Sequence, residues 1–352
     1  VGGGFGKKFE MEAIILASIA AIQSKAPIKL IFTREDDMAF AHPRSPTVQH
    51  LTAVFDDKKA STEQVLGLKQ EIAYGAIEFG DLGLIKPIVD GKAVESEHRF
   101  QIFSLSGADH WYDIPNVDVI SYNQKLVNKV VPVRAVRSVS NNYTVFALES
   151  FIDEIAHELE IDPLNMRLNL LKGEGINSGD GVENLFPEGL KGYVEPGEFG
   201  QRFAHGGGKR LANVLQMAAG FANYGARQMD EFTAHGIAVA GAEERSNPSF
   251  TACIAEIYVN PNSADIDVKK LTIVIDVGLI VNPRNVRAQV EGSIIWGLSN
   301  CLYEEMTLEK GSIVQRNFDE YKWQNVMDLP EIDIHVVENG LYPTGAGEPA
   351  TS

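Results

Sequence analysis

Glu348 is a side chain whose setting in the sequence could suit acid–base chemistry. It lies in "PTGAGEPATS" between a glycine and a proline, so a stiff backbone holds the carboxylate with open space around it. A carboxylate positioned in this way can act as a general base. Most glutamates in such loops are simply solvated, and the loop alone leaves both interpretations open.

Two other stretches contain residues suited to binding an anion or a cofactor. In "VPVRAVRSVSNNY", Arg134 and Arg137 lie among apolar residues just before a predicted helix, where an arginine can hold an oxyanion or a phosphate. A salt bridge to an acid is the structural alternative. In "NPRNVRAQVEGSIIWGLS", Gln289 and Glu291 come early in a helix with a face of small residues. That face permits close approach of a ligand, or ordinary helix packing.

The chain begins with a glycine-rich loop, "VGGGFGKK", followed by a predicted helix over 8–25 with a broad apolar face. Glycines allow positive φ and let backbone N–H groups approach a ligand closely. A loop of this kind that leads into a helix N-terminus can bind an anion. A plain turn before a buried helix is the alternative.

Composition excludes several classes of function. A net charge of −17 over 352 residues argues against nucleic-acid binding. No run of apolar residues is long enough to cross a membrane. Cys253 and Cys301 lie in apolar surroundings and are predicted to be buried thiols. Without a C-x-x-C pair, or histidines at i, i+4 spacing, no metal bound directly by the protein is expected.

The elements that must position these residues indicate an α+β fold with mixed sheets and packed helices. In the first half, the hydrophobic pattern predicts a buried strand at 28–32, an antiparallel hairpin of 47–57 and 65–77, and a helix at 143–161. The second half is expected to contain helices at 210–225 and 282–306 and strands at 235–242, 251–259 and 269–278.

A glycine-rich stretch at 173–208 is expected to separate two halves of the molecule, 1–172 and 209–352. It is interpreted as a linker or a surface excursion.

The order of the motifs is more specific than any one of them. "VGGGFGKK", "VPVRAVRSVSNNYTVFALESFIDEIA", "VIDVGLIVNPRNVRAQVEGSIIWGLS" and "PTGAGEPATS" together resemble the large, molybdenum-binding subunit of the xanthine dehydrogenase and aldehyde oxidase family. The phrases "YDIPNVDV" and "QRNFDEYKWQNVMDLPEIDIHVVEN" resemble its isoquinoline 1-oxidoreductase beta-subunit branch most closely. The resemblance runs nearly from end to end.

This resemblance implies a molybdopterin-binding fold and specific roles for residues. Glu348 would be the catalytic base that takes a proton from a water-derived oxygen, which then attacks an electron-poor carbon. Molybdenum would be held by the pterin, with no metal ligand from the protein. The cofactor-binding residues implied are Gly3, Gly4, Phe5, Gly6, Arg137, Gln289 and Gly347.

The resemblance also implies a cofactor, a partner and a reaction. The cofactor would be molybdopterin cytosine dinucleotide, and a small partner subunit with two [2Fe–2S] centres would accept the electrons. The expected reaction is hydroxylation of a carbon in an N-heteroaromatic ring such as isoquinoline. Oxidation of an aldehyde to a carboxylic acid, and a non-catalytic binding or assembly module, are the alternatives. A carboxylate-pair hydrolase would need a second acid near Glu348, which the sequence does not indicate.

The sequence departs from the family pattern in three ways. "GFGKKFE" lacks the Gly-Gly-Lys-Glu run of the xanthine enzymes, which makes purine an improbable substrate, and Val139 replaces an aromatic residue. A Gly-Gln-Gly motif that precedes the glycine loop in this branch is missing. We therefore expect this sequence to be a C-terminal piece of a longer polypeptide that does not retain molybdenum alone. The compartment stays open between cytoplasm and periplasm, because many relatives carry a twin-arginine export signal.

Overall fold

The computed structural model describes residues 3–56, 65–76, 88–89, 92–93, 104–108, 110–131, 133–172, 207–226, 228–244, 247–338 and 343–352. The linker predicted at 173–208 lies outside these residues except for its last two, where a helix has already begun. Among the described helices, none has the length and hydropathy needed to span a bilayer.

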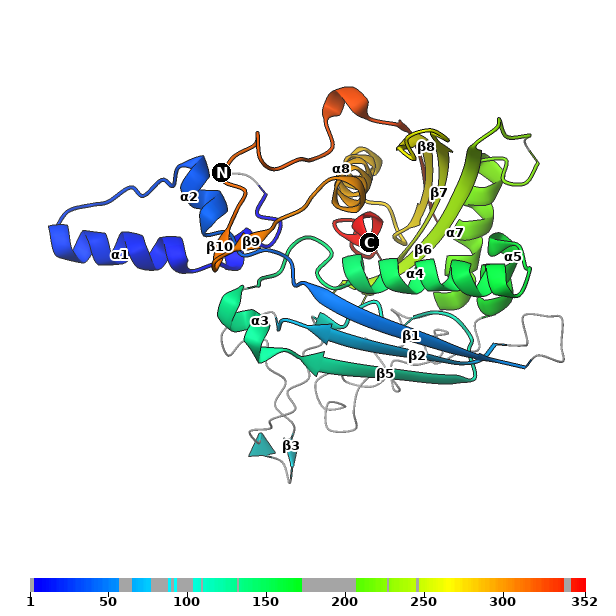
Figure 1. The fold of residues 1–352 in the computed structure, drawn as a ribbon, viewed down its shortest axis with the longest axis horizontal. Helices are drawn as coiled ribbons and strands as arrows, with labels where there is room; N and C mark the ends of the chain where they lie inside the picture. Colours follow the sequence, from blue (N-terminus) through cyan, green and yellow to red (C-terminus); the bar gives the residue numbers. More distant parts are fainter. Residues whose placement is uncertain are drawn as a thin grey trace.

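A three-stranded sheet forms one layer of the molecule (Figure 1). β1 (Thr47–Phe55) pairs with β2 (Val65–Tyr74) in antiparallel register, which confirms the predicted hairpin. β2 in turn pairs in parallel with β5 (Asn116–Asn123), and the short helix α3 (Lys125–Val130) follows. β1 alternates between partly buried and exposed residues, as expected for a strand with one face on the core.

A four-stranded sheet forms the second layer, in the order β11-β8-β7-β6. β6, β7 and β8 form an antiparallel meander, and β11 adds a parallel edge strand that the hydrophobic pattern had not indicated. The strands are β6 (Thr233–Glu244), β7 (Asn247–Val259), β8 (Ile266–Asp276) and β11 (Glu331–Val337). The short strand pairs are β3 (Ile88–Val89) with β4 (Lys92–Ala93), and β9 (Leu308–Glu309) with β10 (Ser312–Ile313).

Two helices cover opposite faces of this second sheet. Alternate residues of β8 belong to different cores: Val274 packs in the cluster that contains α7 (Gly207–Phe221), whereas Ile273 packs in the cluster that contains α8 (Pro283–Leu302). Successive side chains of a strand point to opposite faces, so this alternation places one helix on each side. The expected helices and strands of this half are confirmed.

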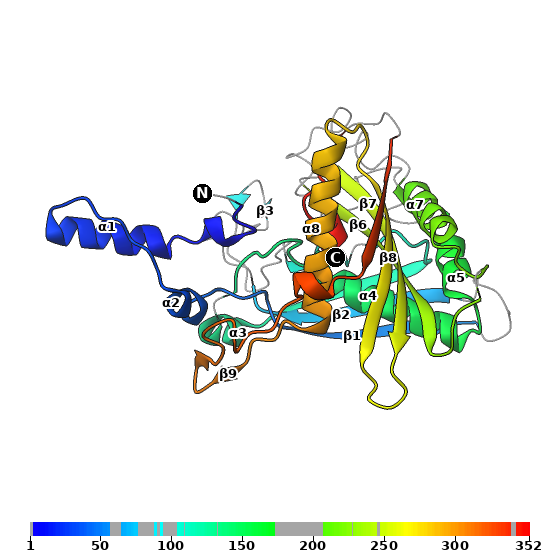
Figure 2. The ribbon, with the colours of Figure 1, turned by 90° about the horizontal axis from the view of Figure 1, so that it is seen from above.

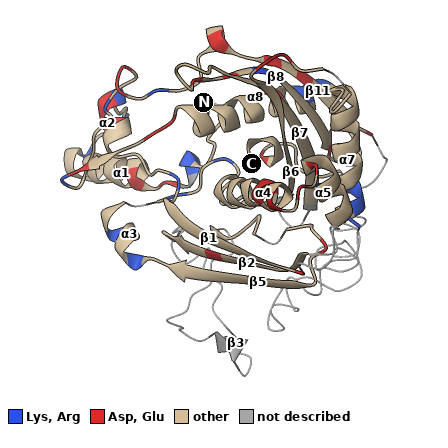
Figure 3. Ribbon diagram, turned by 45° about the vertical axis from the view of Figure 1, so that its right-hand side comes forward, with Lys and Arg blue, Asp and Glu red and all other residues tan. Residues whose placement is uncertain are grey.

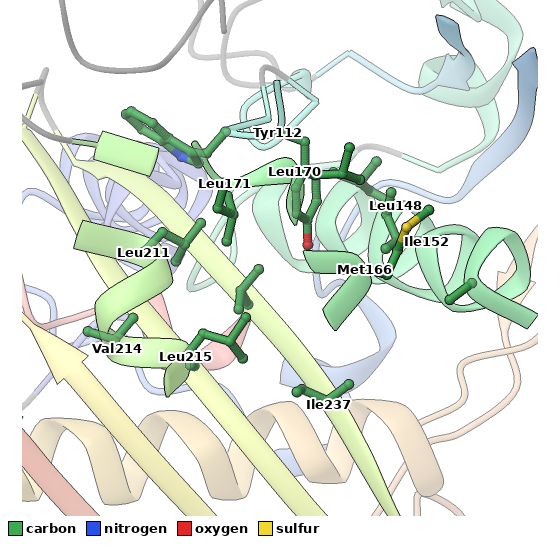
Figure 4. Packing of buried hydrophobic residues seen from close by; sticks show 14 of the residues in the cluster. Tyr112, Leu148, Ile152, Met166, Leu170, Leu171, Leu211, Val214, Leu215 and Ile237 are labelled. Carbon is green, nitrogen blue, oxygen red and sulfur yellow. The ribbon is translucent and has the colours of Figure 1, made fainter. Parts of the chain in front are cut away.

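Helix α4 (Asn141–Glu158) contacts both β1 and β6, so it lies between the two sheets. Its apolar residues recur at three- and four-residue steps, as the sequence predicted for 143–161. α5 (Pro163–Leu170) follows it, and Asp162 caps this helix by accepting a hydrogen bond from the backbone N–H of Asn165 at 3.0 Å. Figure 4 shows side chains of α4, α5 and α7 converging on the larger hydrophobic core.

A buried ion pair connects the elements around this core. The fully buried Arg167 donates from Nε to Glu149 Oε2 at 2.8 Å and from Nη1 to Asp153 Oδ1 at 2.6 Å. Glu149 also accepts from the Tyr112 hydroxyl at 2.7 Å and from the backbone N–H of Val239 at 3.0 Å. Burial alone would lower the pKa of Arg167, but the neighbouring Glu149, Tyr112 and Asp153 outweigh it and raise that pKa. The network ties α4, α5 and β6 together.

The first helix differs from its prediction. α1 (Glu12–Ser24) forms where expected, yet none of its residues is buried, and Figure 2 shows it extending away from the body of the molecule. The strand predicted at 28–32 does not form, and its apolar side chains are largely exposed. A strand needs a partner for its backbone groups, and these residues pair with no strand in the described part of the chain. α2 (Arg34–Ala39) follows.

The surface carries charge on many elements. Acidic positions occur on α2 and α4, and basic positions on α3 (Figure 3). Cys253 is half-buried at the edge of the core that contains α8, so its predicted burial is confirmed only in part. Burial raises the pKa of its thiol to about 12. The expectation of a buried Cys301 is wrong, because this residue is exposed in the last turn of α8, beyond the helix residues that pack on the sheet.

We expect Arg167→Met to lower the free energy of unfolding by about 3–5 kcal/mol, because the substitution leaves the Glu149 carboxylate buried without its cation. Urea denaturation measures this loss. Lys270→Met is the matched control, since it breaks an exposed pair with Glu331 and should cost less than about 1 kcal/mol. Equal effects of the two substitutions would contradict a structural role for the buried pair.

His110 should make stability depend on pH. Burial lowers its pKa to about 4, so the folded protein keeps this imidazole neutral where the unfolded chain protonates it near pH 6.5. Its contribution is therefore complete above pH 6.5 and is lost as the pH falls toward 4. Unfolding free energies measured across this window should fall less steeply for His110→Gln than for wild type. The exposed His50→Gln variant should follow the wild-type slope.

Candidate active site

Arg137 joins three of the sequence segments that were expected to form the site. Its side chain is buried, with 5% of the residue exposed. Nε donates to the carbonyl oxygen of Gly347 at 2.5 Å, and Nη2 donates to Gln289 at its backbone oxygen (3.2 Å) and at Oε1 (3.0 Å). One guanidinium therefore holds the start of α8 against the loop that carries Glu348.

The glycine loop lies against the same arginine. The backbone N–H of Arg137 donates to the carbonyl oxygen of Phe5 at 3.1 Å, and its guanidinium carbon lies 5.6 Å from the centre of the Phe5 ring. The ring also meets Trp296 of α8 edge-on, with 5.4 Å between centroids. Gly6 has φ 107°, and a Cβ atom there would lie 1.7 Å from the carbonyl oxygen of Ala135. Only glycine fits this position.

The glycine loop does not run directly into a helix, as the sequence had suggested. A short 3₁₀ turn, η1 (Lys7–Phe9), comes first, and α1 begins only at Glu12. The N-terminus of α1 therefore does not form the expected anion site with the glycines.

The loop that carries Glu348 is held at both of its sides. On the sheet side, Ser249 of β7 bonds to the Thr344 hydroxyl at 2.8 Å and donates to the Gly345 oxygen at 2.5 Å. On the other side, the Ser138 hydroxyl donates to the backbone carbonyl oxygen of Glu348 at 3.1 Å. Glu348 is half-buried and begins a 3₁₀ turn, η7 (Pro349–Thr351), whose own residues are buried. The backbone beneath the carboxylate is thus fixed by side chains from two directions.

The turn before α4 has an unusual backbone. Ser138 and Val139 have φ values of 71° and 40°, a left-handed region that a β-branched residue rarely adopts. Such residues cost about 1–3 kcal/mol each and are stable only when surrounding contacts hold them. Here the Ser138 hydroxyl also bonds to the Ser352 hydroxyl at 2.7 Å.

Arg44 supplies the contacts that hold this turn. It donates from Nη1 to the Val139 oxygen at 2.6 Å and from Nη2 to the Arg137 oxygen at 2.8 Å. Burial lowers the pKa of Arg44 to about 10, and the nearby Tyr143, Glu304 and Glu348 act against that decrease. At neutral pH, Arg44 therefore carries a positive charge close enough to interact with the candidate base.

Sequence reasoning missed Arg44 and Ser138. The only signal was an arginine in "AHPRSP", between Pro43 and Ser45, and it lies 93 to 95 positions from the residues of the turn that it holds. Two residues that the sequence singled out do not join the site. Arg134 pairs with Glu12 at 3.4 Å, at the base of α1. Glu291 is exposed on α8, and no contact with the other candidate residues is seen.

The residues that meet at Arg137 fit a cofactor rich in hydrogen-bond acceptors. Gln289 is exposed, and Arg137 occupies its side-chain oxygen, so the amide Nε2 group remains available to donate. In the glycine loop, Gly3 and Gly4 provide backbone without Cβ atoms, and Gly3 lies next to the exposed ring of Phe5. A pterin presents ring nitrogens, a carbonyl oxygen and a phosphate, which suit such donors. The contacts of these residues with a cofactor stay predictions.

Two family models match the chain, and both describe a molybdopterin cofactor-binding domain. One covers residues 1–69 and 91–170, and the other covers residues 193–330. Together they match well over half of the chain.

Two curated relatives match the chain over almost its entire length. A membrane-bound aldehyde dehydrogenase (pyrroloquinoline-quinone) of Gluconacetobacter polyoxogenes is 32% identical over 100% of this chain and 42% of its own length. Isoquinoline 1-oxidoreductase subunit beta of Brevundimonas diminuta is 25% identical over 99% of this chain and 38% of its own length. The chain thus spans less than half of either relative.

Solved structures of low sequence identity share the fold. Quinoline 2-oxidoreductase from Pseudomonas putida 86 has a TM-score of 0.70 at 13% identity and covers 100% of this chain and 63% of its own. The aldehyde oxidoreductase of Desulfovibrio desulfuricans has a TM-score of 0.65 at 14% identity, over 100% and 50% of the two chains. The α+β fold with mixed sheets is confirmed. The chain belongs to the xanthine dehydrogenase and aldehyde oxidase family of molybdopterin-binding proteins.

Proposed function

We propose that this chain forms the catalytic half of a molybdenum hydroxylase site, with Glu348 as the general base. The observation that carries the proposal is the pair of Arg137 contacts, which bring Gln289 and Gly347 together. Segments from four distant parts of the sequence meet there, and Glu348 directly follows Gly347, one of the residues that meet. This arrangement is what a positioned base requires.

In this proposal the chain's own residues bind the cofactor and move a proton. Backbone groups of Gly3 and Gly4, together with the Gln289 amide, hold the molybdopterin, which supplies a Lewis acid and an acceptor for two electrons. The Glu348 carboxylate accepts a proton from the water that provides the oxygen atom. Arg44 and Ser138 keep the backbone of Glu348 in place during this transfer.

We propose an aldehyde as the substrate, which the reaction converts to a carboxylic acid. The support is the name of the 32%-identical relative, an aldehyde dehydrogenase. A carbon beside the nitrogen of an N-heteroaromatic ring is the second candidate, supported by the isoquinoline oxidoreductase relative at 25% identity. Both substrates present an electron-poor carbon to the same base, so the site chemistry is shared.

The remaining parts of the proposal concern the electron path and the cofactor. We propose that electrons leave to a partner subunit with [2Fe–2S] centres, since neither cysteine of this chain has a second one nearby in sequence to bind a cluster. The cofactor is proposed to be the cytosine dinucleotide form. One relative is named for pyrroloquinoline quinone, and the test below assays for quinone as well as molybdenum.

The experiment that tests the function is Glu348→Gln in the molybdenum-loaded holoenzyme that contains this chain. Losing the base should lower kcat by roughly 10²–10⁴-fold with unchanged molybdenum content. Turnover is measured with an artificial electron acceptor, and bound molybdenum by elemental analysis, alongside a quinone assay. Glu291→Gln, an exposed glutamate on α8, is the matched control and should retain activity.

The same assay distinguishes the competing functions. Faster turnover of an aliphatic aldehyde than of isoquinoline supports the first substrate class, and the reverse supports the second. A non-catalytic binding module predicts equal, negligible turnover in the wild type and the Glu348→Gln variant. Bound quinone without molybdenum would contradict the proposed cofactor.

Arg44→Lys should lower kcat by roughly 10–100-fold, because one ammonium group cannot satisfy the carbonyl oxygens of Arg137 and Val139 in the same planar geometry. The turn would relax and Glu348 would shift with it, while molybdenum content stays unchanged. Arg287→Lys is the control, since Arg287 likewise donates to a backbone carbonyl oxygen, that of Ile334, but away from the turn. Similar kcat values for the two variants would exclude a positioning role for Arg44.

A further inference from the structure

Three side chains with metal-binding atoms meet at the base of α1, and none of them takes part in the candidate active site. His42 Nδ1 lies 3.3 Å from Glu10 Oε1, and His42 Nε2 lies 3.5 Å from Glu12 Oε1. One ligand atom from each residue lies within 4.8 Å of the other two. The glutamates come from the start of the chain, whereas His42 comes from the segment that follows α2.

His42 is the distinctive member of this group. Only 8% of its side chain is exposed, yet its buried Nδ1 atom makes no hydrogen bond within the described structure. A buried polar atom without a hydrogen bond costs about 1–3 kcal/mol. The imidazole is packed between two carboxylates, of which Glu10 is mostly buried and Glu12 is half-exposed. A cation bound between the two carboxylates would give the His42 imidazole the partner that its Nδ1 atom lacks among the described residues.

We propose that Glu10, Glu12 and His42 bind a divalent transition-metal cation. One imidazole nitrogen and two carboxylate oxygens suit Zn²⁺ and Mn²⁺. Because Glu12 is half-exposed, water has access to the remaining coordination positions. Three protein ligands with an open position are enough to hold Zn²⁺.

Two cations now lie beside these carboxylates, and each has another partner. Lys7 is 3.8 Å from Glu10 but 2.8 Å from Asp37, and its side chain is half-exposed. Arg134 is 3.4 Å from Glu12 and also donates to the Val133 oxygen at 3.1 Å. Both cations can therefore withdraw when a metal neutralises the carboxylates. A protonated His42 between the carboxylates is the competing explanation, and the experiment separates the two.

A metal in this position would stabilise the fold by joining three segments of the chain. It would connect the residues that follow the glycine loop, the first turn of α1, and the segment that leads from His42 to Arg44 two residues later. The exposed helix α1 would then be fixed at its base. The glycine loop and the arginine that holds the 137–140 turn would become parts of one rigid unit.

The test is Zn²⁺ binding to chelator-treated protein, measured by calorimetry and by metal analysis after dialysis, without any assay of turnover. We expect the chelator-treated protein to bind one Zn²⁺ per chain. Its melting temperature should be higher with Zn²⁺ than with EDTA. His42→Gln should weaken binding roughly tenfold or more, since removal of even an indirect supporting contact costs about 10–100-fold. Glu12→Gln should do the same, and because Glu12 is half-exposed this variant should fold normally.

His50→Gln is the matched control, because His50 also lies beside a carboxylate, 3.4 Å from Glu71, on the sheet of β1 and β2. It should leave the affinity for Zn²⁺ unchanged. The proposal is overturned if the wild type binds no more Zn²⁺ than His42→Gln, or if His50→Gln reduces binding equally. NMR of the His42 imidazole gives a further test. If acid shifts its resonances but Zn²⁺ does not, His42 forms an imidazolium ion pair with the carboxylates, and the metal proposal is overturned.

Discussion

The site depends on one buried guanidinium. Arg137 has almost no access to water, so the hydration of its charge must be replaced by protein acceptors. Those acceptors are two carbonyl oxygens and one amide oxygen, contributed by Gln289 and Gly347. Charge-assisted hydrogen bonds are the strong ones, at about 1.5–3 kcal/mol each. Satisfying this one cation therefore fixes the separation between α8 and the loop that carries Glu348.

The same arginine lies in a turn that would not be stable alone. Ser138 and Val139 have a backbone conformation that the turn maintains only because Arg44 holds its carbonyl oxygens and Ser138 bonds to the Glu348 backbone. The strained backbone of this turn is therefore stable only while the contacts from Arg44 and the Glu348 loop are in place. A change at Arg44, far from Glu348 in sequence, acts on the carboxylate through the shared turn, which explains why a residue with no direct chemical role is expected to matter for turnover.

Apolar residues are buried in one part of the molecule and exposed in another. Around α4, α5 and α7, apolar side chains are buried in a continuous core with a satisfied ion pair inside it. At α1, a helix with many apolar residues has none of them buried. The proposed cation site at Glu10, Glu12 and His42 lies where this exposed helix joins the rest of the chain, so a metal there would provide rigidity that packing does not.

The sequence by itself determined the elements and the family. Periodicity is local, so it predicted α4, α7, α8 and the β1–β2 hairpin, and four ordered motifs identified the molybdopterin-binding family. It could not show that residues 28–32 pair with no strand in the described part of the chain, that the apolar face of α1 is exposed, or that β11 joins the sheet beside β8. Only the tertiary structure decided that Arg137 meets Gly347, that Arg44 holds the turn at 137–140, and that His42 lies between Glu10 and Glu12. Those contacts join residues 30 to 210 positions apart, and no spacing rule within a helix or strand encodes a distance between such residues.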